Sequence, residues 1–287
     1  MAGHPVVVTD STASLPPEVA TERGIVVVPL HVVIGAGVHD EGSPEASPAK
    51  LAAALREFVP VSTSRPTPAA FAETYERLAA HGATEIVSIH ISGDMSGTFE
   101  SAQLAARQVS VPVTTVDSRQ VGIATGFAAL TAADVLDAGG SAAAAVGAAR
   151  DRAAASSSLF YVDTLEYLRR GGRIGAAAAL FGGALAVKPL LTIADGRVST
   201  LEKVRTSARA LARLEVLAAE RAGDLAVDVS VAHLADEDRA GQLATRLRQR
   251  LAANLDGREL WCGELGAVLG AHVGPGMLAV CVAPRPG

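Results

Sequence analysis

The sequence predicts a two-domain α/β protein, and three observations carry this prediction. The chain has 287 residues, which exceeds the roughly 100 to 200 residues of a typical domain. In the first half, short β-branched runs alternate with alanine-rich helical stretches, the pattern of a parallel sheet covered by helices. The second half is different, with glycine-punctuated turns and paired strands. We therefore expect one α/β domain over residues 1–160 and another over residues 161–287.

The first half contains four expected strands, at residues 6–9, 25–34, 85–90 and 113–116. The expected helices lie between and after them, at residues 17–23, 48–58, 68–81, 97–108 and 120–138. Two of these helices have a clear start, because Ser47 precedes Pro48 and Thr67 precedes Pro68. In each case a hydroxyl side chain can cap the helix and proline suits its first turn.

The second half begins after an alanine-rich helix expected at residues 142–155. The expected strands are residues 158–162, a pair around the turn at 194–197, and residues 226–233, 259–262 and 277–282. The expected helices are residues 207–222 and 237–253. We find no internal repeat.

Composition narrows the classes of function. The formal net charge is -5, which disfavours nucleic acid or an anionic membrane as a partner. Cys262 and Cys281 lie in apolar contexts and are expected to be small buried thiols, as in a reducing cytoplasm. The start has no signal-peptide pattern, and residues 175–187 are too few to span a membrane. We expect a cytoplasmic protein without cofactor, metal or stable membrane insertion.

Polar residues lie in two connections of the first half. Asp10, Ser11 and Thr12 come after the first strand, where an α/β sheet places its ligand crevice, although capping of a turn is the favoured interpretation. Thr63 and Ser64 precede the helix at 68–81. They are not needed as its cap, because Thr67 already occupies that position. This favours a binding role for Thr63 and Ser64.

The segment from Ile91 to Ala102 leads from a strand directly into a helix. Ser92, Ser96 and the amides around Gly97 and Thr98 can bind an anion there, because a helix start offers free N–H groups and a positive dipole end. The segment lacks the lysine of a nucleotide P-loop and the glycine pattern of a nucleophile elbow. Ser96 as a helix N-cap remains an alternative of comparable weight.

Two glycine-rich segments complete the candidate residues. His272 is expected in a loop, GAHVGPG, which favours a ligand role over a structural one. Arg169, Arg170 and Arg173 surround a glycine pair that should end a short helix. The first two arginines suit a helix C-terminus, whereas Arg173 lies beyond it and is a candidate contact for a phosphate or an acidic partner.

These segments, in this order, resemble the DegV family, which includes the FakB subunits of bacterial fatty acid kinase. The resemblance extends over essentially the whole chain. The matching motifs are TDST, TSRP, SGDMSGT, VDS, DTLEYLRRGGRI, KPLLTIADGRV, KVRT and GAHVGPG. Each motif is weak alone, and their ordered conjunction is specific.

The resemblance implies a two-domain α/β fold with an acyl chain in a tunnel between the domains. Carried over by motif, Thr63, Ser96 and His272 would hold the carboxylate of a long-chain fatty acid. Arg173 would face an ATP-dependent kinase subunit or its phosphoryl group. Three departures are Arg65 at a glutamine-like position, Asp94 inside the serine loop, and Ala271 and Val273 beside the histidine. Asp94 should face solvent, since an inward carboxylate would repel the ligand.

Two other functions compete with lipid binding. A hydrolase using Ser96 as nucleophile and His272 as base would also need an orienting group and an oxyanion site, neither of which the sequence identifies. A DNA-binding regulator is disfavoured by the acidic charge and the lack of a basic helix-turn-helix.

Overall fold

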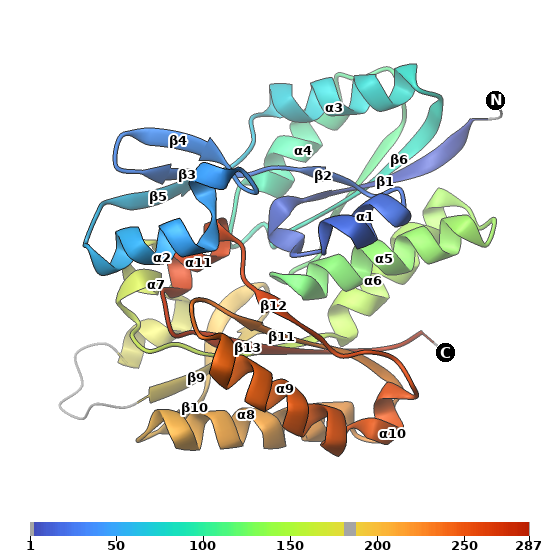
Figure 1. The fold of residues 1–287 in the computed structure, drawn as a ribbon. Coiled ribbons are helices and arrows are strands. Elements are labelled where there is room, and N and C mark those ends of the chain that lie inside the picture. Colours follow the sequence, from blue (N-terminus) through green and yellow to red (C-terminus); the bar gives the residue numbers. More distant parts are fainter. Residues whose placement is uncertain (1–2, 181–187, 287) are drawn as a thin grey trace. The chain divides into compact units, whose positions relative to one another are not determined.

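The computed structural model describes residues 3–180 and 188–286, and its chain folds into two compact units (Figure 1). Unit 1 consists of Met1–His31 and Ser64–Ala155. Unit 2 consists of Val32–Thr63 and Ser156–Gly287. The change from one unit to the other after Ala155 lies close to the boundary expected near residue 160. The single-boundary expectation missed that residues 32–63 leave the N-terminal unit and pack with the C-terminal one.

Unit 1 is built on a four-stranded parallel sheet of order β2-β1-β6-β7. Its strands are β1 (His4–Asp10), β2 (Val26–Val28), β6 (Ala83–His90) and β7 (Val113–Asp117). Its helices are α1 (Pro17–Glu22), α3 (Pro68–Ala80), α4 (Thr98–Ala106), α5 (Ile123–Asp137) and α6 (Ala142–Ala155). The short 3-10 helix η1 (Ser11–Ala13) follows β1. This confirms the parallel α/β sheet predicted from the sequence.

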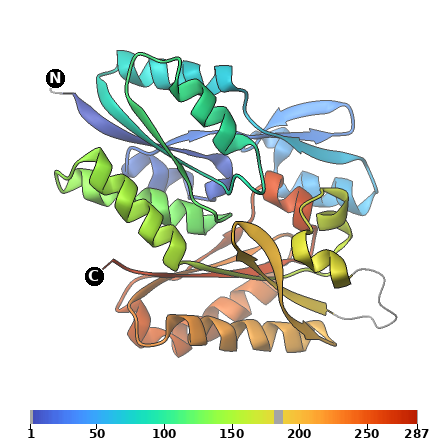
Figure 2. The same ribbon diagram turned by 180° about the vertical axis from the view of Figure 1, so that it is seen from behind.

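Alternation along the strands creates a core on each face of this sheet. Val7 packs with the alanines of α5 and α6, whereas its neighbour Val8 packs with Phe71 and Tyr75 of α3. Successive side chains of a strand point to opposite faces, so both faces of β1 are buried. Figures 1 and 2 show α3 and α4 on one side of this sheet and α5 and α6 on the other. Thr67 caps α3 through its hydroxyl, as expected.

Unit 2 contains a six-stranded sheet of order β10-β9-β8-β13-β11-β12. Only the β11–β12 pair is parallel. The strands are β8 (Ser157–Tyr161), β9 (Lys188–Ala194), β10 (Arg197–Val204), β11 (Val227–His233), β12 (Trp261–Glu264) and β13 (Leu278–Pro284). Helices α8 (Ser207–Ala222), α9 (Glu237–Arg250) and α10 (Ala252–Leu255) pack against it through one apolar cluster (Figure 2).

The inserted stretch 32–63 forms a structure of its own. A three-stranded sheet of order β4-β3-β5 combines β3 (His31–Ile34), β4 (Gly37–Asp40) and β5 (Val61–Ser64). The 3-10 helix η2 (Pro44–Ala46) and helix α2 (Pro48–Arg56) lie between β4 and β5. The single strand expected over 25–34 is two strands, because Pro29 interrupts it and cannot donate to a ladder.

Two short helices complete unit 2, α7 (Glu166–Arg170) and α11 (Ala267–Val273). Helix α11 packs on α2, and a Cβ atom at Gly270 would collide with Leu51. The alanine-rich stretch 175–187 is described as far as the 3-10 helix η3 (Gly175–Leu180), and residues 181–187 lie outside the described part. No helix among the described residues is long and apolar enough to cross a membrane. Cys281 is buried, but Cys262 is exposed, contrary to expectation.

Candidate functional site

The structure brings Thr63 and His272 together within unit 2. Thr63 lies near the end of β5, and its Oγ1 is 2.9 Å from Nε2 of His272. His272 lies in the last turn of helix α11, so the expected loop is wrong at this position. The sequence did not predict this helix, because three glycines surround the histidine. In addition, the buried residues of α11 are only Ala267, Val268 and Gly270, which is a weak apolar pattern.

Helix α7 packs closely against His272. A Cβ atom added to Gly171 would collide with Nδ1 of His272, and one added to Gly274 would collide with the ring of Tyr167. Gly171 ends α7 and Gly274 ends α11, so glycine at both helix ends allows the two elements to approach. The glycine-rich segments that the sequence singled out therefore hold the imidazole in place.

The imidazole of His272 is electrically neutral at pH 7. Burial, and secondly the positive charge of Arg173, lower its pKa from 6.5 to about 4. Its Nδ1 atom is buried and has no hydrogen-bond partner among the described residues. A buried polar atom without a partner is costly and uncommon, and this one lies against Gly171 at the end of α7.

Arg173 has a structural contact that the sequence did not predict. Its Nη1 donates to the carbonyl of Gly171 over 2.6 Å. The backbone around it closes α7 in a Schellman arrangement, with Arg173 N bonded to Leu168 O and Gly172 N bonded to Arg169 O. Gly172 has the positive φ of 70° that this arrangement requires. Arg173 is thus fixed at the end of α7, where its charge acts on His272.

Residues 91–98 of unit 1 form a second candidate region, here called the serine loop. Ser96 Oγ lies 2.9 Å from Thr98 Oγ1 and accepts a longer bond from Thr98 N. Gly97, and not Ser96, is the N-cap residue of α4, which corrects the N-cap alternative for Ser96. Ser92 is fully buried, and its backbone carbonyl accepts from Ser96 N.

The two charged departures from the family pattern also have defined positions. Arg65 donates to Gly97 O over 3.0 Å and pairs with Glu100 at 2.8 Å. Its charge is therefore partly balanced within unit 1, and it holds the end of the serine loop. Asp94 is exposed, as expected.

The other polar candidates, in the turn after β1 and at the end of β5, also have defined positions. Asp10 caps η1 by accepting from Thr12 N, as the capping interpretation predicted. Ser11 Oγ accepts from Leu30 N over 2.9 Å, which ties this turn to the chain before β3. Ser64 is exposed at the end of β5. Thr63 and His272 belong to unit 2, whereas Ser96 belongs to unit 1.

Sequence reasoning missed a buried polar chain in unit 1, formed by Tyr75, Ser88, His90 and Asp10. Tyr75 Oη is 2.8 Å from Ser88 Oγ, which is 2.7 Å from Nε2 of His90. Nδ1 of His90 is 2.9 Å from Oδ2 of Asp10. Ser88 and His90 are two residues apart in β6 and so share a face of the strand. That spacing on an apolar strand was the only sequence clue.

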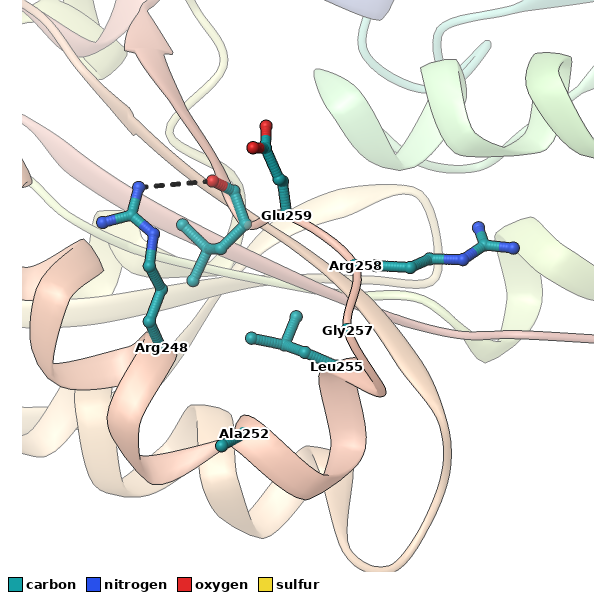
Figure 3. Close-up of a pocket in the computed structure, with 7 residues that line it drawn as sticks. Arg248, Ala252, Leu255, Gly257, Arg258 and Glu259 are labelled. Atoms are coloured by element: carbon teal, nitrogen blue, oxygen red, sulfur yellow. Dashed lines mark hydrogen bonds between the residues drawn. The ribbon is translucent and has the colours of Figure 1, made fainter.

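An open pocket of about 530 Å³ lies elsewhere in unit 2, at the end of α9 (Figure 3). Leu255 and Leu260 contribute apolar surface, and Arg248 donates to Leu260 O over 3.4 Å. Arg258 extends away from the other labelled side chains and pairs with Asp228. Both arginines already have acceptors, and none of the predicted site residues lines this pocket.

The arrangement does not resemble a hydrolase or a metal centre. In the described part of the chain, no carboxylate is hydrogen-bonded to His272 Nδ1 to orient the ring as a general base. Over residues 3–180 and 188–286, no group of three or more His, Cys, Asp or Glu side chains could hold a metal ion. The groups that the structure offers are neutral hydroxyls and one neutral imidazole, which suit hydrogen bonding to an anion.

Known proteins are similar over almost the entire chain. A family model described as "Uncharacterised protein, DegV family" matches residues 5–285. A DegV domain-containing protein of Streptomyces coelicolor is 54% identical over 285 residues, covering 99% of this chain and 100% of the relative.

Solved structures show the same fold. A structure described as fatty acid binding of a DegV family protein from Thermus thermophilus has a TM-score of 0.91 and 33% identity, covering 98% of this chain and 100% of that chain. DegV, a fatty acid binding protein from Bacillus subtilis, has a TM-score of 0.87 and 31% identity, with coverage of 99% and 100%. The two-unit α/β architecture predicted from the sequence is thus confirmed, and the chain belongs to the DegV family.

Proposed function

We propose that this protein binds a long-chain fatty acid and holds its carboxylate through Thr63, Ser96 and His272. The observation that carries the proposal is the Thr63–His272 hydrogen bond, which orients the hydroxyl of Thr63. The relatives from Thermus thermophilus and Bacillus subtilis, described as fatty acid binding, support the choice of ligand. A hydrolase is not favoured, because Nδ1 of His272 has no orienting partner among the residues that the structure describes.

The protonation of His272 determines what Thr63 can donate. A proton on Nδ1 would be a buried donor without an acceptor among the described residues, which is unfavourable. The favoured tautomer therefore carries its proton on Nε2 and donates it to Thr63 Oγ1. The hydroxyl proton of Thr63 is then left for a third atom. A carboxylate oxygen is a suitable acceptor for it.

Ser96 can donate in the same way. Its Oγ accepts from Thr98 N and can also accept from the hydroxyl of Thr98, which leaves its own proton for a ligand. Helix α4 begins two residues later and contributes the positive end of its dipole. In this proposal, Thr63 and Ser96 each donate one hydrogen bond to the carboxylate.

Neutral donors suit a protein that presents its ligand to another enzyme. An acyl chain of about 15 methylenes at ~0.8 kcal/mol each gains on the order of 12 kcal/mol before losses, so the tail can supply the affinity. The head group then needs only orientation. We propose that an ATP-dependent fatty acid kinase subunit in the cytoplasm phosphorylates the held carboxylate, with Arg173 facing that partner.

Native mass spectrometry of gently purified protein tests the proposal. We expect a bound mass equal to one long-chain fatty acid, lost on delipidation and regained when palmitate is added. The Thr63→Val variant, which keeps the volume of the side chain and removes its hydroxyl, should regain much less. Protein that is consistently empty and does not take up palmitate would contradict the proposal.

A further inference from the structure

The buried polar chain of unit 1 ends at the carboxylate of Asp10, and both oxygens of this carboxylate accept hydrogen bonds. Asp10 Oδ1 accepts from Thr12 N over 3.1 Å and from Thr12 Oγ1 over 2.5 Å. Asp10 Oδ2 accepts from Nδ1 of His90 over 2.9 Å and from Ile91 N over 3.1 Å. Asp10 and His90 are both fully buried. Both oxygens of this buried carboxylate thus accept two hydrogen bonds each.

Each hydrogen bond of the buried polar chain is donated in the same direction, from Tyr75 toward Asp10. Burial raises the pKa of Tyr75, so its hydroxyl keeps its proton. Tyr75 then donates to Ser88, Ser88 donates to Nε2 of His90, and Nδ1 of His90 donates to Asp10. In the reverse direction the Tyr75 proton would have no acceptor, since Ser88 is its only hydrogen-bond partner in the described part of the chain.

The chain joins two neighbouring strands at the end where ligands bind in α/β sheets. Asp10 is the last residue of β1, and His90 is the last residue of β6. The carboxyl ends of such strands carry the loops that form ligand sites. The bond from Ile91 N to Asp10 fixes the first residue of the serine loop, and Gly93 N is bonded to Asp117 Oδ1 over 3.2 Å.

We propose that the buried Asp10–His90 pair is a positioning device that fixes the serine loop in the geometry needed to bind an acyl carboxylate. This inference rests on the proposed function and deepens it. Asp10 and His90 act through the loop, and neither touches the ligand. Stability alone is a weak reason for such a pair, because a buried ion or polar pair is often replaceable by apolar residues without loss.

Head-group selectivity separates positioning from general stability. Palmitate and hexadecanol have the same chain length but differ in head group, so the ratio of their affinities reports only on the carboxylate site. Both are measured by displacement of a fluorescent acyl probe from the full chain. Asp10→Asn places an amide where two bonds must be accepted, and should lower the palmitate-to-hexadecanol ratio by roughly tenfold, the effect of one lost charge-assisted hydrogen bond.

The matched control is Ile86→Val, a cavity-forming change in the same strand on an apolar residue. It should lower the melting temperature and leave the ratio at the wild-type value. If Asp10→Asn does not fold, Ser88→Ala and Tyr75→Phe decide the question, because they shorten the chain from its far end. Their loss of selectivity should be graded, larger for Ser88→Ala than for Tyr75→Phe.

The outcomes distinguish the two proposals. Wild-type protein that binds neither palmitate nor hexadecanol contradicts the proposed function, and this inference with it. Wild-type protein that prefers palmitate, together with folded Asp10→Asn protein that keeps the same preference, overturns the positioning role alone. If Asp10→Asn is unfolded, wild-type selectivity in both shorter-chain variants also overturns it. A lowered ratio in the variants with an unchanged ratio in Ile86→Val supports it.

Discussion

Each unit contains a histidine hydrogen-bonded to a neighbouring side chain. The two histidines differ in how many of their ring nitrogens have a hydrogen-bond partner. His90 of unit 1 is fully buried, and both ring nitrogens have partners. His272 of unit 2 has one partner, Thr63, and its Nδ1 has none among the described residues. A satisfied buried network rigidifies its surroundings, whereas the Thr63–His272 pair leaves the hydroxyl proton of Thr63 for a ligand. The difference underlies our proposal that His90 supports a binding site and that His272 belongs to one.

The largest expected effect is on stability, and it comes from removing the carboxylate of Asp10 from the buried polar chain of unit 1. Asp10→Ala leaves four donors without their acceptor, and breaking a buried pair in this way costs about 3–5 kcal/mol. The free energy of unfolding, measured in urea, should fall by this amount. Asp94→Ala, which removes an exposed acid of the same unit, should change it by less than about 0.5 kcal/mol. Equal effects for the two variants would contradict the comparison.

The stability of the protein should depend on pH through His272 of the Thr63–His272 pair. Because the pKa of His272 is lowered to about 4, the unfolded chain takes up a proton between pH 6.5 and pH 4 that the folded chain does not. Its contribution to stability is present at pH 6.5 and above, and is lost as the pH falls toward 4. We expect a loss of about 2 kcal/mol, since each pKa unit is worth 1.36 kcal/mol and the ring is only partly buried.

Urea titrations at several pH values measure this loss. The His272→Asn variant should have a flatter profile between pH 6.5 and pH 4. His81→Asn, which removes an exposed histidine of unit 1, should keep the wild-type profile. If the stability of His272→Asn falls with pH as steeply as that of the wild type, the lowered pKa of His272 is not the cause of the loss.

A smaller effect tests how the imidazole of His272 is held. Gly171 has helical backbone angles that alanine accepts, but its added Cβ would collide with Nδ1 of His272. Gly171→Ala should therefore cost about 1–2 kcal/mol by overpacking and should displace the imidazole resonances in an NMR spectrum. Gly172→Ala is the matched control, because its φ is positive but no atom lies near its Cβ position. It should destabilise by strain, about 1 kcal/mol, without moving those resonances.

The sequence was sufficient to predict the long helices, because their periodicity and caps depend on residues close together in the chain. The helix expected at 142–155 is α6, and the helix expected at 207–222 is α8. It was insufficient for β4 and β5, which are four residues long and partly exposed, so that neither has an apolar run. Their pairing depends on contacts between distant parts of the chain.

For the candidate site, the sequence singled out residues but could not predict how they bond. Thr63 and His272 are 209 positions apart, and only the fold brings them within hydrogen-bond distance. Helix α11 was hidden by its glycines, and the partners of His90 could not be read from the sequence because they come from separate elements. The capping roles of Asp10 and Thr67 were predictable, since such contacts form within a few residues.

The most direct test of the account is the NMR signal of palmitate labelled with ¹³C at its carboxyl carbon and bound to the protein. The account predicts one bound resonance that shifts in Thr63→Val, which removes a donor to the carboxylate, and in His272→Asn, which removes the ring that orients this donor. It should not shift in Ser64→Ala, which alters the exposed hydroxyl next to Thr63. A bound resonance that is the same in the wild type, Thr63→Val and His272→Asn would contradict the central claim that Thr63 and His272 hold the head group.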